Sequence, residues 1–128
     1  MKINKTTSFI ETFRPNRWLL RFPDNFNIKE FCVSKISNPK YNNKKGWKKI
    51  TIRLYDLIGL ETTKNLIDNI SRVPVKVCLE KLDHTGVCVE KIEIYSKKIS
   101  VDLGKFDYSS EKLSTIKVKL KPMNVIVL

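Results

Sequence analysis

Residues 47–56 read WKKITIRLYD, and from Ile50 onward every second side chain is apolar. Ile50, Ile52 and Leu54 therefore point to one face of an extended chain, while their polar neighbours point to the other. This alternation predicts a β-strand that starts at Trp47 and has one buried face.

The same alternation recurs on both sides of this strand. It predicts further strands at residues 17–22, 73–82, 87–95, 99–103 and 113–121, and a less regular extended segment at 26–36. The turn-forming tetrapeptide Asp83–Gly86 predicts a β-hairpin between two of these strands. The apolar phase slips at 96–98, which predicts a bend or bulge there.

Residues 60–71 change to a helical period, with Thr62 as the expected N-cap. The residues on the predicted apolar face are Thr63, Leu66, Ile67 and Ile70. About six strands with one helix predict an α+β, mainly β fold, an antiparallel β-sandwich or half-barrel with one short flanking helix.

The length of 128 residues fits a single domain covering 1–128. Within it we expect an N-terminal arm at 1–16, a long basic loop at 37–46 and a C-terminal tail at 122–128. Hydrophobic residues make up 41% and charged residues 30%, a balance that excludes a disordered chain and a membrane-spanning one. The 25 Lys and Arg outnumber the 13 Asp and Glu, so an acidic partner is expected.

The first 13 residues contain no apolar run of the kind found in signal peptides or membrane helices, so we expect assembly in the cytoplasm. Cys32, Cys78 and Cys88 lie far apart, and an odd number of cysteines cannot pair fully within one chain. We expect them to be reduced, buried thiols.

The pattern of reactive residues does not predict an enzyme. His84 is the only histidine and falls in a predicted turn, which leaves no base beside a nucleophile and no zinc ligand set. The four glycines are isolated, so none belongs to a phosphate-binding loop. We expect a structural or binding role, without a cofactor or metal.

Three stretches of the chain resemble phage tail tube proteins. Residues 47–56, with Gly59 and the helix that follows, are similar to the tryptophan-led strand and short helix of that family. Residues 82–91 are similar to its Leu-Asp-x-x-Gly hairpin, and residues 99–113 to its last connection, with an Asp-Tyr-Ser-Ser turn. The resemblance as a whole covers roughly residues 17–121, and the three stretches follow one another in the family's order.

The resemblance implies a fold shared by contractile tail tubes and the related Hcp ring of type VI secretion. It implies a virion structural protein, located in the phage tail and assembled in the bacterial host cytoplasm. Six copies would close a ring, and stacked rings would form the tube that conducts DNA during ejection. The implied partners are further copies, sheath or baseplate proteins, and passing genomic DNA contacted without sequence specificity.

Exposed segments are the expected contacts between subunits, together with the N-terminal arm. The candidates are Tyr41, Asn42, Lys44, Lys45, Trp47, His84, Thr85 and Gly86. Asp107, Tyr108 and Ser109 are expected to form a structural turn in which the tyrosine acts as a plug. Trp18 and Trp47 are expected to pack in the core or between subunits rather than to stack on bases.

The positive charge is the feature that fits the resemblance least. Lys117, Lys119 and Lys121 share one face of the last strand, whereas the resemblance implies an acidic bore. We therefore expect these lysines to face an acidic sheath or a neighbouring ring. Two alternatives remain open, a tube-related baseplate or tail completion ring protein, and a small basic β-barrel that binds nucleic acid.

Overall fold

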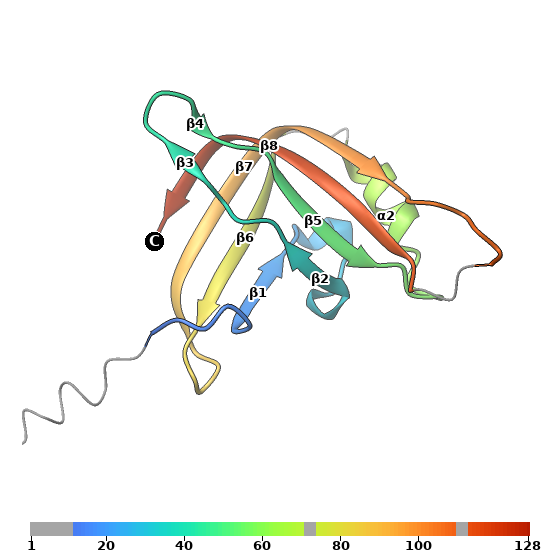
Figure 1. Cartoon of the computed structure of the whole chain (residues 1–128), viewed down its shortest axis with the longest axis horizontal. Helices are drawn as coiled ribbons and strands as arrows, with labels where there is room; N and C mark the ends of the chain where they lie inside the picture. Colours follow the sequence, from blue (N-terminus) through green and yellow to red (C-terminus); the bar gives the residue numbers. More distant parts are fainter. Residues whose placement is uncertain (1–11, 71–73, 110–112) are drawn as a thin grey trace, which may run out of the picture.

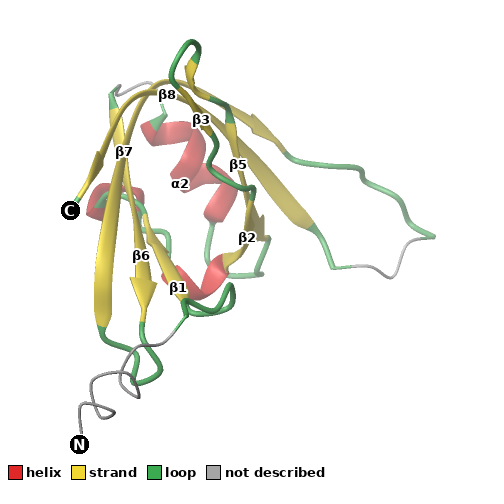
Figure 2. Cartoon of the chain, turned by 60° about the vertical axis from the view of Figure 1, so that its left-hand side comes forward, coloured by secondary structure: helices red, strands yellow, loops and turns green. Residues whose placement is uncertain are grey.

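A six-stranded antiparallel sheet curls around a helix in the computed structural model, as Figures 1 and 2 show. The structure describes residues 12–70, 74–109 and 113–128. Three parts of the predictions lie outside the described residues. They are most of the N-terminal arm, Val73 at the start of the strand predicted at 73–82, and residues 110–112.

The sheet has six strands in the order β1-β6-β7-β8-β5-β2. They are β1 (Trp18–Arg21), β2 (Val33–Ile36), β5 (Ile50–Tyr55), β6 (Val75–Leu82), β7 (Cys88–Asp102) and β8 (Thr115–Val127). The sheet is nearly closed, and its open side lies between the two edge strands, β1 and β2. The predicted half-barrel with one helix is confirmed.

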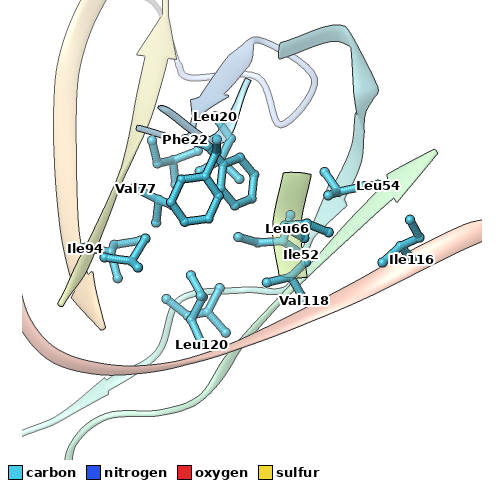
Figure 3. Close-up of a cluster of buried hydrophobic side chains, with 14 residues drawn as sticks. Leu20, Phe22, Ile52, Leu54, Leu66, Val77, Ile94, Ile116, Val118 and Leu120 are labelled. Atoms are coloured by element: carbon cyan, nitrogen blue, oxygen red, sulfur yellow. The ribbon is translucent and has the colours of Figure 1, made fainter. Parts of the chain in front are cut away.

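Strand β5 shows how the concave side of the sheet becomes apolar. Ile50, Ile52 and Leu54 are fully buried, and Ile52 pairs with Val118 of β8 while Leu54 pairs with Ile116. The inward faces of the other long strands contribute the same kind of side chain, so that one apolar core fills the concave side (Figure 3). The strand begins at Ile50 and not at Trp47, because Lys48 and Lys49 separate it from a small hairpin described below.

The helix α2 (Thr62–Asn69) packs into the concave side of the sheet through Leu66, which Figure 3 places beside Ile52 and Val118. The predicted N-cap at Thr62 was wrong. Glu61, with φ +51°, is the N-cap residue and makes no side-chain cap bond, while Thr62 is the first helical residue and is buried.

The buried stripe of the helix also differs from the predicted one. Leu66 is buried and Ile70 packs against the core, as predicted, but Thr62 and Asn69 are also buried whereas Ile67 is 51% exposed. Asn69 also makes a tertiary contact, because its side-chain oxygen accepts a 3.1 Å hydrogen bond from the side-chain amide of Asn25.

Residues 26–36 were predicted as one extended segment, which was wrong for its first part. Two short 3₁₀ helices, η1 (Asp24–Phe26) and η2 (Glu30–Cys32), precede β2. Their turns place Phe26 and Cys32 in the interior and leave Phe31 exposed. This explains the irregular apolar pattern of the segment.

The last two strands are longer than predicted. β7 runs without a break through 96–98, where its register with β8 shifts on both sides of Ser96, so the predicted bulge is confirmed. β8 continues past Lys121 to Val127, and Leu128 exchanges two backbone hydrogen bonds with Lys91. Residues 122–127 are therefore part of the sheet and not a separate tail.

The three cysteines are free, as predicted, but they are not all buried. Cys32 is buried, Cys78 is half-buried and Cys88 is exposed at the start of β7. Burial raises the pKa of the Cys78 thiol, which keeps it protonated and unreactive near neutral pH.

Candidate functional site

The predicted loop at 37–46 contains a hairpin arm, formed by β3 (Tyr41–Asn42) and β4 (Gly46–Trp47). The rings of Tyr41 and Trp47 lie 5.2 Å apart at an angle of 56°, within the range of favourable aromatic pairs. The side-chain oxygen of Asn42 accepts a 2.8 Å hydrogen bond from the Lys44 amide, and Lys45 completes the turn. The predicted contact residues from Tyr41 to Trp47 are thus held together on one small arm.

The remaining predicted contact residues lie on the β6–β7 turn. The carboxylate of Asp83 accepts hydrogen bonds from the amide and hydroxyl of Thr85, at 2.8 and 2.6 Å, and from the amide of Val87 at 3.0 Å. Gly86 has φ +87°, which favours glycine at this position. His84, Thr85 and Gly86 are exposed, at the opposite end of the molecule from the hairpin arm (Figure 1).

The hydrogen bond from the Thr85 hydroxyl is the main reason why the pKa of Asp83 lies below its usual value. A lowered pKa means that the ionised carboxylate stabilises the turn above the unfolded pKa, and that this contribution disappears as pH falls through the folded value. Thr85→Ala is expected to move the Asp83 pKa upward, which a pH titration of its carboxyl carbon by NMR would measure. Thr85→Ser keeps the hydroxyl and should leave the pKa low; an upward shift in both variants would contradict the assignment.

The predicted turn at Asp107 is present, but Tyr108 is not a plug. The Asp107 carboxylate accepts hydrogen bonds from the Ser109 amide and hydroxyl, at 2.9 and 2.7 Å. These bonds close the turn without the tyrosine, and the Tyr108 ring is fully exposed. Phe106 and Leu113 are also exposed, so the β7–β8 connection presents apolar side chains to solvent.

A largely apolar groove of about 630 Å³ opens between the two edge strands of the sheet. Its walls include Trp18 of β1, Ile36 of β2, Trp47 of β4, Leu79 of β6 and Ile92 of β7. The two tryptophans lie far apart in the sequence, and only the curl of the sheet brings them to one groove. Sequence reasoning identified both as packing residues but could not place them together.

A second feature that sequence reasoning missed is the open edge of β8, defined here as residues 122–127. On one side these residues pair with β7, but on the other side β5 reaches only to Leu120. Met123, Ile126 and Val127 are exposed on this segment. No strand among residues 12–70, 74–109 and 113–128 pairs with this edge, and such an edge with apolar side chains is a template for pairing with another strand.

The positive charge gathers on one outer surface of the sheet. We call this surface the basic face, and it comprises Lys35, Arg53, Lys98, Lys117, Lys119 and Lys121. The predicted alternation of β8 is confirmed, since Ile116, Val118 and Leu120 are buried while the three lysines between and beyond them point outward.

Within residues 12–70, 74–109 and 113–128, no group of three or more His, Cys, Asp or Glu side chains is arranged to hold a metal ion. In the same residues, no helix has the length and hydrophobicity needed to cross a membrane.

The structure resembles chains of contractile injection systems. A chain in the extended sheath–tube complex of the extracellular contractile injection system PVC superimposes with a TM-score of 0.65 at 12% identity, over 97% of this chain and 96% of that one. A chain of the PVC sheath/tube terminator superimposes with a TM-score of 0.64 at 12% identity, over 94% of this chain and 99% of that one. A chain of the tube-terminating cap of the anti-feeding prophage superimposes with a TM-score of 0.62 at 10% identity, over 94% of this chain and 93% of that one. No family model matches the sequence, and no curated protein matches it either.

Identities of 10–12% establish the fold and nothing beyond it. The chain has the tube-like fold found in these injection systems, along almost its whole length. The fold implied by the resemblance to phage tail tube proteins is thereby confirmed.

Proposed function

We propose that this chain is a structural subunit of a contractile tail or injection system, in which copies form rings that stack into a tube. The observation that carries the proposal is the open edge of β8, which offers unpaired backbone groups and apolar side chains together. Its fold, shared with tube and terminator chains, supports the same role.

The ring would form by strand addition. A strand at the edge of one copy pairs with the open edge of β8 in the next, which satisfies backbone groups that a single copy leaves exposed. The open edge of β8 and the edge strand that pairs with it are different surfaces, so the contact between copies is head-to-tail. Such contacts form a closed ring when the rotations between successive copies add up to a full turn. Six copies per ring is our proposal for that closure.

Stacking would use the two ends of the molecule. The hairpin arm carries Tyr41, Asn42, Lys44, Lys45 and Trp47 at one end, and the turn with His84, Thr85 and Gly86 lies at the other. A contact between unlike ends can repeat along an axis without limit, as a tube requires. We place the contacts between rings at these residues.

The partners that follow from this role are further copies, a sheath and a baseplate, with genomic DNA as the cargo of the tube. The particle would be a phage tail or a related injection device, assembled in the bacterial cytoplasm. The role is mechanical and needs neither a catalytic group nor a cofactor.

A ring that ends the tube is a second candidate. The likeness to the anti-feeding prophage cap and the PVC terminator favours it as specifically as the sheath–tube likeness favours the tube. A terminating ring would share the lateral contact but would lack a stacking contact on one side.

Negative-stain electron microscopy of the purified chain at rising concentration tests the proposal. Rings that stack into tubes are expected for a tube subunit, whereas single rings that do not stack would identify a terminating ring. A chain that stays monomeric at all concentrations, confirmed by sedimentation, would contradict both.

A further inference from the structure

The basic face has a regular arrangement that follows from the strand register. Lys35, Arg53 and Lys117 are direct partners across β2, β5 and β8, and they form one row. Lys121 and Lys98 form another row across β8 and β7, with Lys119 between the two rows. Outward positions recur about every 6.8 Å along a strand and about 4.8 Å between strands, so the six cations form a grid.

The cations of the basic face have no ionic partners among the described residues. The one carboxylate in their rows is Asp102, opposite Lys117, and its oxygen accepts a 2.9 Å hydrogen bond from the Gly104 amide. Six positive charges against one negative charge leave an unbalanced surface that attracts an anion.

The other half of the sheet's outer surface is different. Arg21 pairs with Glu80 at 2.8 Å and with Glu30, and Lys76 pairs with Glu93 at 3.3 Å. Charges there are matched locally, on β1, β6 and the first half of β7. On the outer surface of the sheet, the unbalanced positive charge therefore lies on β2, β5, β8 and the second half of β7.

The side chains between the cations indicate which kind of anion fits. Thr51 and Ser100, which flank Lys119, are small and polar, and Tyr55 lies at the far end of β5. The cores of protein interfaces are depleted in lysine and depend on buried aromatic or arginine anchors. Arg53 is the one arginine of the basic face and its other five cations are lysines, a composition that fits a chain of phosphates better than the core of a protein interface.

We propose that the basic face binds the phosphodiester backbone of nucleic acid, without reading its sequence. Lysine contacts to phosphates release counterions and allow the protein to slide along the strand. Such binding is compatible with DNA that moves past the protein. The proposal replaces our expectation that these lysines face an acidic sheath. It rests on the charge distribution of a single copy and not on ring formation.

The test is the affinity of the full chain for a 30-base-pair duplex, measured by fluorescence anisotropy between 50 and 200 mM salt. We expect two duplexes of unrelated sequence to bind equally, with log Kd rising linearly with log salt. Lys117→Gln with Lys119→Gln is expected to reduce that slope by about 0.9 for each lysine that no longer neutralises a phosphate. Lys117→Arg with Lys119→Arg keeps both positive charges and should keep the slope. This variant distinguishes an effect of the lost charges from an effect of disturbed folding.

The matched control is Lys29→Gln with Lys64→Gln. Both residues are exposed lysines outside the basic face, so this variant has the same net charge. Equal weakening by both Gln pairs would mean that only net charge matters and would overturn the proposal. So would the absence of binding by the unmodified chain at 50 mM salt, or equally tight binding of poly-glutamate, which would indicate an acidic protein partner. The measurements are made below the concentration at which rings appear, so their outcome is independent of assembly.

Discussion

Leu66→Ala is expected to lower the free energy of unfolding by about 2–5 kcal/mol, the range for removal of a buried leucine side chain. Leu66 is fully buried and is the main apolar contact of α2 with the core. Its truncation leaves a cavity between the helix and strands β5 and β8. Urea unfolding followed by circular dichroism measures the change.

Ile67→Ala is the matched control for this substitution. It stands next to Leu66 on the same helix, but its side chain is 51% exposed, so the expected change is within about 0.5 kcal/mol. Equal destabilisation in the two variants would show that the helix is buried through the face predicted from the sequence. The pair thus tests the orientation of the helix directly.

Val125→Pro combined with Val127→Pro is expected to prevent ring formation at the concentration at which the unmodified chain assembles, while leaving the monomer folded. Leu128 exchanges both backbone hydrogen bonds with Lys91, so by the alternation of an antiparallel ladder the amide of Ile126 also points toward β7. The amides of Val125 and Val127 then point to the open edge. Proline removes these two donors and leaves the β7 ladder intact.

Removing two hydrogen bonds from each lateral interface costs about 1–3 kcal/mol, so the concentration needed for rings should rise about 5- to 150-fold. Electron microscopy and sedimentation follow the rings, and circular dichroism follows the fold. Val125→Thr with Val127→Thr keeps both amides and should assemble normally. Rings formed by the proline variant at the original concentration would show that the open edge of β8 is not the lateral contact.

The strands of the sheet could be predicted because alternation is a local signal. Each inward position of β5 was identified correctly from residues 50–55 alone. The segment at 26–36 and the face of α2 could not be predicted in the same way. In α2 the buried residues Leu66 and Asn69 make contacts with distant parts of the chain while Ile67 faces solvent, and a local pattern does not contain such contacts.

The candidate surfaces were predictable only in part. Lys117, Lys119 and Lys121 were placed on one face because they belong to one strand. Adding Lys35, Arg53 and Lys98 to the same surface requires the register of β2, β5, β8 and β7, which no local pattern contains. The last strand was predicted to end at Lys121, but Pro122 lies where the register with β7 shifts, a position that tolerates proline, and β8 continues to Val127.

The position of β8 has a consequence for the order in which the molecule folds. β8 is the last strand in sequence but lies in the interior of the sheet, where it is the sole link between the β2–β5 pair and the β1–β6–β7 group. Until residues 115–127 leave the ribosome, these two groups have no shared ladder, and each exposes an apolar face. Cotranslational folding therefore cannot complete the sheet before β8 has been made, because residues 115–127 join its two halves.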